Sequence, residues 1–239
     1  MNRDYLLRQI ALQRKYEEDC SLGVPVRRVN LSGSDFSGMD LSALNFSNMN
    51  LSGCNFENCT LSHIRFENTN LIDADFSDTS LTYVLFKNAK VSYAGFERCS
   101  LHGVTILASE FDGVNFFDTT LYGCRVESSD LVSANYKYSQ IFHTTFEHSV
   151  LTDTVFEHSN LTSIELESSK FDYARVENCI FVDVNTYKNL IVPMDNTEFK
   201  ETKFFNCDFS GVDLTTVCFD KCFYDLLNNS NLKGEQKHE

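Results

Sequence analysis

Hydrophobic side chains recur at every fifth residue over most of this chain. From Leu31 to Phe181, each of 31 successive fifth positions is apolar, and Leu and Phe alternate over the first part of this stretch. An α-helix repeats every 3.6 residues and a strand every two, so neither element explains a sustained period of five. The pattern predicts a solenoid in which each pentad contributes one inward side chain, the pentad centre, and then turns a corner.

The residues around each centre follow a second pattern. A small residue lies two positions before the centre, Asn or Asp often lies directly before it, and Gly or Asn often lies two positions after it. Glycine and Asx residues tolerate tight corners because they adopt positive φ or hydrogen-bond to their own backbone. The segment SGMDLSALNFSNMNLSGCNF, residues 37–56, shows this arrangement in successive pentads.

This arrangement resembles the motif Ala-(Asp/Asn)-Leu-X-X of the pentapeptide-repeat family. The resemblance covers about residues 24–224 of this chain. It implies an all-β fold, a right-handed quadrilateral β-helix with about 20 residues per coil. We therefore expect the solenoid to span residues 23–224, followed by a polar C-terminal tail at 225–239.

The open ends of a solenoid need covering, because they expose apolar side chains and unpaired strand edges. Residues 3–19 place Leu6, Ile10 and Tyr16 among charged residues, which predicts an amphipathic helix. We assign residues 1–22 to a short N-terminal capping helix. Either apolar end of the solenoid could instead form a homodimer interface.

The period of five fails once, at residues 186–197, and resumes at Phe199. Removing 13 residues places Phe199 at the corner due at position 186. Pro193 and the polar residues after it are typical of a loop that leaves the ladder of strands. We therefore expect a loop at about 186–197 that interrupts the solenoid at one corner.

Composition limits the partners of the chain. It contains 34 acidic and 20 basic residues, a net charge of -14, which opposes direct binding to nucleic acid or an anionic membrane. The N-terminus lacks the apolar core of a secretory signal, and no apolar run is long enough to span a membrane. Five of the nine cysteines lie two residues before a centre, at a small core position. These features favour a cytoplasmic protein with reduced thiols.

Candidate catalytic and metal-binding residues are scattered. The histidines of the repeat follow pentad centres by one or two residues and should point outward, and His148 and His158 fall on opposite faces. Cys218 and Cys222 have no second pair of ligands that would complete a zinc site. We therefore expect no enzymatic activity, no metal and no cofactor.

Glutamates recur directly after several centres. Glu127, Glu147 and Glu167 follow centres on one Phe-rich face, and Glu157 and Glu177 do so on the opposite face. Two interpretations remain open for these acidic columns. They form a solvated edge that keeps the solenoid soluble, or a regular anionic column offered to a protein groove that normally holds nucleic acid.

Large apolar residues replace the usual Ser, Thr or Glu after some centres. These residues are Leu107, Phe117, Tyr122, Val132 and Phe142. Tyr122 and Phe142 should stack on the same face. Exposed aromatic residues often mark a contact surface, although this group could instead lie beneath the 186–197 loop.

The resemblance also suggests a function. Well-understood family members are acidic rods that imitate duplex DNA and bind type II topoisomerases. This implies a non-catalytic binder of DNA gyrase or topoisomerase IV, used in resistance or immunity, with the five glutamates and the loop around Pro193 as contacts. The chain differs from those members in its predicted N-terminal helix and shows no evident C-terminal dimerisation helix. The alternative is an interaction scaffold, such as a secreted effector or signalling adaptor, that binds through Phe117, Tyr122 and Phe142.

Overall fold

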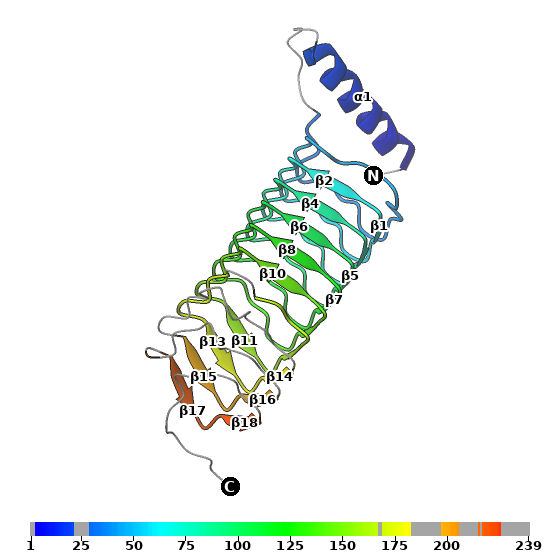
Figure 1. Ribbon diagram of the computed structural model, residues 1–239. Helices are drawn as coiled ribbons and strands as arrows, with labels where there is room; N and C mark the ends of the chain where they lie inside the picture. The colour runs from blue at the N-terminus through cyan, green and yellow to red at the C-terminus, as the bar shows by residue number, and fades with distance from the viewer. Residues whose placement is uncertain are drawn as a thin grey trace.

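A rod of parallel strands forms most of the molecule. The computed structural model describes residues 3–21, 29–166, 169–182, 197–205, 215 and 217–225. Figure 1 shows the coils stacked on one another, with the helix α1 (Arg3–Ser21) at the N-terminal end. The fold is the predicted right-handed quadrilateral β-helix with an N-terminal helix.

Each coil has four faces. We number the faces in chain order by their pentad centres: face 1 runs from Leu31 to Phe171, face 2 from Phe36 to Phe219, face 3 from Leu41 to Tyr224, and face 4 from Phe46 to Leu166. Parallel pairing joins residues 20 apart, such as Leu61 and Leu81. Equivalent side chains of successive coils therefore stack in columns along the rod.

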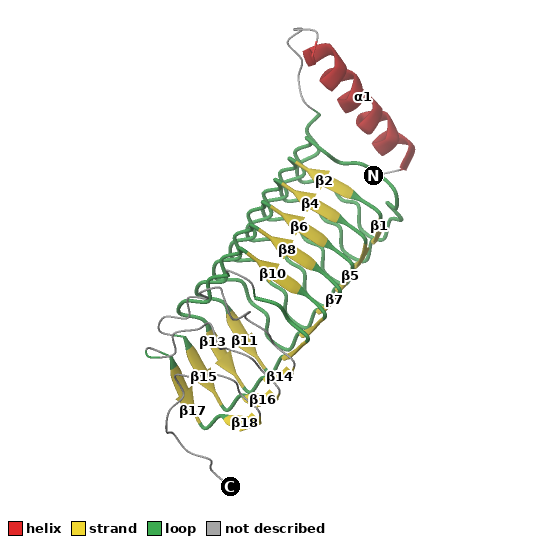
Figure 2. Cartoon of the chain, in the orientation of Figure 1, coloured by secondary structure: helices red, strands yellow, loops and turns green. Residues whose placement is uncertain are grey.

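The strands are three residues long and form three sheets, drawn in yellow in Figure 2. Face 3 holds nine strands: β1 (Thr60–Ser62), β3 (Ser80–Thr82), β5 (Ser100–His102), β7 (Thr120–Tyr122), β9 (Gln140–Phe142), β12 (Asn160–Thr162), β14 (Ile180–Val182), β16 (Lys203–Phe205) and β18 (Phe223–Asp225). Face 4 holds five: β2 (Arg65–Glu67), β4 (Leu85–Lys87), β6 (Thr105–Leu107), β8 (Arg125–Glu127) and β10 (Thr145–Glu147). Face 2 holds four: β11 (Val155–Glu157), β13 (Arg175–Glu177), β15 (Glu198–Lys200) and β17 (Cys218–Asp220). The described residues of face 1 are joined by isolated bridges, such as Asn50 to Asn70.

The second residue after each centre turns the corner in a left-handed conformation. Between Gly33 and Asn178, the described corner residues have φ values from 48° to 68°. Glycine adopts this conformation freely, and Asn and Asp adopt it at modest cost. This requirement explains the predicted preference for Gly and Asn at the corners. Some corners nevertheless carry bulky residues, such as Tyr83 and Tyr93.

The Asn or Asp directly before a centre closes a local turn. Its side-chain oxygen accepts a hydrogen bond from the backbone N–H two residues later. Asn50 accepts in this way from Ser52 at 3.2 Å, and Asp75 accepts from Ser77 at 2.9 Å. The Asx position of the sequence motif is therefore an Asx turn.

The core is a narrow column of pentad centres. Every predicted centre from Leu31 to Phe181 is buried. On face 2, the aromatic rings from Phe36 to Phe156 stack coil on coil, with centroid separations of 4.7 to 5.2 Å. Rings of face 4, such as Phe66, meet this stack edge to face. Both arrangements are favourable for aromatic pairs.

Several of the small residues two positions before a centre form hydrogen bonds to the preceding coil. Thr79 Oγ1 donates a hydrogen bond to Phe56 O, and Cys99 Sγ donates to Phe76 O, each at 2.8 Å. Burial raises the pKa of Cys54 to about 11 and that of Cys99 to about 12. These thiols are protonated core donors, in agreement with their predicted structural role.

The helix α1 packs on the first coil. Leu6 is buried within the core cluster. Gln13 Oε1 accepts a hydrogen bond from Val29 N at 3.0 Å, and Glu17 Oε1 accepts one from Asn48 Nδ2 at 2.8 Å. The helix therefore covers the N-terminal end of the core, and it extends two residues beyond the predicted 3–19.

The pairing around the predicted 186–197 loop corrects its register. Phe199 pairs with Val176, and Phe204 pairs with Phe181, so this coil contains 23 residues and has three extra. The prediction that 13 residues are inserted, with Phe199 at the corner due at position 186, is therefore wrong. The Phe-rich faces 2 and 4 lie half a coil apart, so residue type alone does not distinguish the two registers. Residues 183–196, with Pro193, lie outside the described residues.

Candidate binding surfaces

The acidic residues of the rod gather on two adjacent faces. Among the described residues, face 2 has eleven acids and five bases, face 1 has six acids and two bases, and face 4 has four acids and three bases. We call faces 1 and 2 together the acidic side. Its acids are Asp35, Glu57, Asp73, Asp75, Asp78, Glu97, Glu110, Asp112, Asp118, Asp130, Asp153, Glu157, Asp172, Glu177, Glu198, Glu201 and Asp220.

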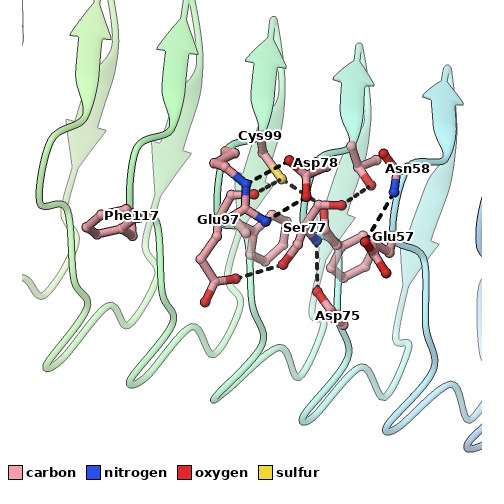
Figure 3. Close-up of polar contacts among 12 residues, drawn as sticks. Glu57, Asn58, Asp75, Ser77, Asp78, Glu97, Cys99 and Phe117 are labelled. Carbon is pink, nitrogen blue, oxygen red and sulfur yellow. Dashed lines mark hydrogen bonds and ion pairs between the residues drawn. The ribbon is translucent and has the colours of Figure 1, made fainter.

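Polar contacts hold the carboxylates of face 2 in place, as Figure 3 shows for its middle coils. Arg98 donates to both carboxylate oxygens of Asp78, at 2.8 and 2.6 Å, and this contact lowers the pKa of Asp78. Ser77 Oγ donates to Glu97 at 2.9 Å. Charge-assisted hydrogen bonds of this kind fix geometry, so face 2 presents ordered rather than freely rotating carboxylates.

Three carboxylates crowd together on face 1. Glu110 and Asp130 are bridge partners in adjoining coils. One oxygen of Asp112 and one of Asp130 are buried without a hydrogen-bond partner among the described residues. Burial raises the pKa of Asp112, and the nearby charges of Asp130 and Glu110 raise it further. The cluster therefore opposes folding when all three groups are ionised.

The glutamate column predicted on face 4 forms with a cation beside it. Glu127 and Glu147 are register partners in adjoining coils. Arg125 lies 2.7 Å from Glu127 and 3.7 Å from Glu147, so these two carboxylates share one guanidinium group. Glu167 lies outside the described residues. Together with the other bases of face 4, Arg125 leaves this column close to neutral.

The glutamate column predicted on face 2 is also paired with cations. Glu157 and Glu177 are register partners. Lys137 lies 2.6 Å from Glu157, and Lys200 lies 2.8 Å from Glu177. Half of the excess acid of face 2 therefore comes from other pentad positions. The residue after each centre, taken alone, does not reveal this one-sided charge.

Face 3 is uncharged along most of its length. Between Cys59 and Val182 it contains no Asp, Glu, Lys or Arg, although the chain as a whole carries a charge of -14. Its outward residues are mainly Ser, Thr, Asn and Gln, with aromatic residues among them. We call this surface, formed by β1, β3, β5, β7, β9, β12 and β14 with the corner residues that follow the first six of these strands, the neutral strip.

Histidine and tyrosine rings alternate along one edge of the neutral strip. Successive ring centroids lie 5.3 Å apart for His63 and Tyr83, 5.8 Å for Tyr83 and His102, 5.1 Å for His102 and Tyr122, and 5.5 Å for Tyr122 and His143. The rings of His102 and Tyr122 are parallel to within 4°. We call these five residues the His–Tyr ladder.

The predicted aromatic contact residues divide between two faces. Tyr122 belongs to the His–Tyr ladder. Phe142 is its register partner on the next strand, as predicted, but it is half-buried. Phe117 lies on face 2, away from the polar contacts drawn in Figure 3, and its ring contacts Tyr138 with a centroid separation of 5.4 Å. The structure therefore separates Phe117 from Tyr122 and Phe142.

The pentad positions of the ladder histidines predict only that each points outward, and this alone does not indicate a site. The ladder combines residues one position after a centre, such as His102, with residues two positions after it, such as His63. A comparison of residues at a single pentad position therefore does not reveal the ladder. The ladder can be recognised in the sequence when both of these positions on face 3 are considered together.

Metal ligands are not gathered in the described residues, where no three His, Cys, Asp or Glu side chains form a candidate site. In the same part of the chain, no helix is both long and apolar enough to cross a membrane.

Comparison with known proteins finds a family model that matches part of the repeat. Residues 26–106 match the model of the pentapeptide repeat region, and no curated protein matches the chain in sequence. HetL, a pentapeptide repeat protein involved in heterocyst differentiation regulation in the cyanobacterium Nostoc sp. strain PCC 7120, is 15% identical, with a TM-score of 0.49 over 93% of this chain and 94% of its own. Full-length QnrB1, a plasmid-mediated fluoroquinolone resistance protein, is 14% identical, with a TM-score of 0.32 over 82% and 91%. A pentapeptide repeat protein from the Arabidopsis thaliana thylakoid lumen is 18% identical, with a TM-score of 0.34 over 57% and 67%.

Proposed function

We propose that this chain, whose residues 26–106 match the pentapeptide repeat region and whose coils hold side chains in fixed columns, is a non-catalytic protein that binds through its acidic side. The partner is a protein with a basic groove, and the groove that fits an acidic rod is one that normally holds duplex DNA. A type II topoisomerase, DNA gyrase or topoisomerase IV, has such a groove. The expected role is cytoplasmic resistance or immunity, without direct binding to nucleic acid or membrane.

The observation that supports this proposal is the one-sided charge. The acids of faces 1 and 2 exceed the bases by about one per coil, or one net charge per ~4.8 Å of rod. Duplex DNA carries about one charge per 1.7 Å of axis, so the acidic side has roughly a third of that density. Binding by charge alone should therefore depend less steeply on salt than DNA binding does.

The contact residues predicted from the sequence divide between the two sides of the rod. Glu157 and Glu177 lie on the acidic side, whereas Glu127 and Glu147 lie on the nearly neutral face 4. The proposal assigns the main contact to the acidic side and treats Glu127 and Glu147 as peripheral. A contribution from the segment around Pro193 stays a prediction.

A supercoiling assay with purified gyrase, and a decatenation assay with topoisomerase IV, test the proposal. Each enzyme is titrated with the full chain, with and without a quinolone. We expect inhibition of the enzyme, or protection of it from the quinolone, together with measurable binding. The absence of binding, inhibition and protection for both enzymes would refute the proposal.

An interaction scaffold unrelated to DNA is the second candidate function, and the neutral strip favours it. This surface combines aromatic residues with an absence of charge, as contact surfaces often do. Here the double change of Tyr122→Ser and Phe142→Ser, both on the neutral strip, should abolish capture of a partner other than a topoisomerase. Retention of that capture would exclude the aromatic residues as the scaffold's binding surface.

A further inference from the structure

We propose that the neutral strip is the contact surface of a weak homodimer, in which two copies of the rod lie side by side with their acidic sides facing outward. This inference does not depend on the proposed function. It rests on the distribution of charge, the exposed rings and the repeat distance of the coils.

Charge selects the surface on which two copies can meet. Like charges brought together in an interface cost several kcal/mol, and the described residues of faces 1 and 2 together carry 17 acids against seven bases. The neutral strip lacks charged residues from Cys59 to Val182. Two chains of charge -14 therefore approach each other with least repulsion through this strip. The same lack of basic residues argues against an anionic partner.

The exposed rings favour a protein surface as the occupant. Tyr83 and Tyr122 are 55% and 45% exposed, in the middle of the strip. His102 and Tyr122 stack on each other along the rod, so the edges of their rings point outward. A sugar would stack on ring faces, and these faces are already covered. Ring edges with hydroxyl and imidazole groups suit the mixed apolar and polar contacts of a protein interface.

The coil spacing identifies a second copy as the partner. Side chains of the strip recur once per coil, at the ~4.8 Å spacing of paired strands. A second copy has the same spacing, so the side chains of one rod fall between those of the other along the whole strip. A two-fold axis between β5 and β7 would set Tyr122 of one copy against His102 of the other, which makes the surface self-complementary.

The size of the strip predicts weak association. Seven strands at ~4.8 Å give a contact about 30 Å long, and a three-residue strand is about 10 Å wide. Even with the corner residues included, this is below the ~800 Å² per partner of a standard interface. We therefore expect a dissociation constant in the micromolar range, and tighter association at high salt, because salt screens the repulsion between the acidic sides.

Sedimentation velocity of the full chain, from ~1 to ~300 μM at ~50 and ~500 mM salt, measures this equilibrium. The variant Tyr122→Lys places a charge in the strip and should weaken the dimer by about tenfold or more. The exposed Ser100, on β5, provides a second test through Ser100→Lys. The matched control is Tyr173→Lys, because Tyr173 is 56% exposed on face 1 and the change in net charge is the same.

The expected result is a dimer that Tyr122→Lys and Ser100→Lys weaken and Tyr173→Lys leaves intact, with all variants showing native circular dichroism. A chain that is monomeric at every concentration and salt overturns the proposal. A dimer that resists both strip variants, or that Tyr173→Lys weakens equally, also overturns it, because the contact then lies elsewhere.

Discussion

At the scale of single residues, the left-handed corners restrict which side chains the rod displays. Gly103 and Gly123 occupy neighbouring corners of face 3, each with a φ of 61°. Their surroundings differ. The ring of Tyr83 lies over Gly103, where a Cβ would be 2.7 Å from two ring carbons, whereas nothing lies within 4 Å of a Cβ at Gly123. Gly103 therefore makes room for the His–Tyr ladder.

We predict that Gly103→Ala destabilises the chain more than Gly123→Ala. Both variants force a Cβ into a left-handed corner, at a cost of roughly 1–2 kcal/mol. Gly103→Ala also displaces Tyr83 from its contacts with His63 and His102. Urea unfolding of the two variants measures the difference. Equal losses of stability would show that Tyr83 does not rest on Gly103.

Two aspartates should change the pH dependence of stability in opposite directions. The pKa of Asp112 is raised above its ordinary value of 3.8 by burial and by Asp130 and Glu110. The folded chain therefore loses stability as the pH rises from 3.8 through the raised pKa. At neutral pH we expect Asp112→Asn to be more stable than the native chain, by less than about 1 kcal/mol because the group is partly exposed. This gain should vanish below pH 3.8.

Asp78 provides the opposite case, because hydrogen bonds from Arg98 lower its pKa. Its contribution to stability is present above pH 3.8 and is lost as the pH falls through the lowered pKa. Asp78→Asn should therefore be less stable than the native chain at neutral pH, and the difference should close in acid. Thermal unfolding across the acidic and neutral range tests both aspartates. If Asp112→Asn and Asp78→Asn changed stability in the same direction at neutral pH, this account of their surroundings would be wrong.

At the scale of elements, the pentad is the unit that the sequence specifies best. Every centre from Leu31 to Phe181 is predictable, because each pentad can bury one large side chain and the period leaves no other choice. The register after Val176 is not predictable in this way. Phe is the commonest centre on both faces 2 and 4, so a shift of half a coil preserves the pattern of residue types. Only the observed strand pairing of Phe199 distinguishes the registers.

The helix α1 offers an element-scale test of docking. Leu6 is completely buried, whereas its neighbour Leu7 is 42% exposed. Leu6→Ala should cost about 2–5 kcal/mol of docking free energy, and Leu7→Ala should change stability by at most about 0.5 kcal/mol. The helical signal in far-ultraviolet circular dichroism, followed through a urea titration, reports the difference. Similar losses of helix stability in both variants would mean that the helix does not pack through Leu6.

At the scale of the whole molecule, the rod separates an acidic side from an uncharged strip. The sequence predicted two acidic columns on opposite faces, and their described members Glu127 and Glu147, and Glu157 and Glu177, are register partners. The cations that balance the charge of these glutamates were not predicted, because Arg125 occupies another pentad position and Lys200 belongs to an adjoining coil. The His–Tyr ladder escaped prediction for a related reason, since its members alternate between two pentad positions. The ion pairs and the ladder form between residues of different coils or pentad positions, whereas the burial of the centres follows from the period alone.

The central claim, that the acidic side of the rod is its binding surface, is tested by two triple variants with the same change in net charge. The first, Glu57→Gln, Asp118→Asn and Asp153→Asn, removes acids from faces 2 and 1. The second, Glu67→Gln, Glu127→Gln and Glu147→Gln, removes acids from face 4. The measurement is the affinity of each triple variant and the native chain for purified gyrase across a range of salt concentrations. We predict that the first triple weakens binding about tenfold and flattens its salt dependence, while the second changes affinity less than about threefold. Equal weakening by both triples, or a larger effect of the second, would contradict the claim.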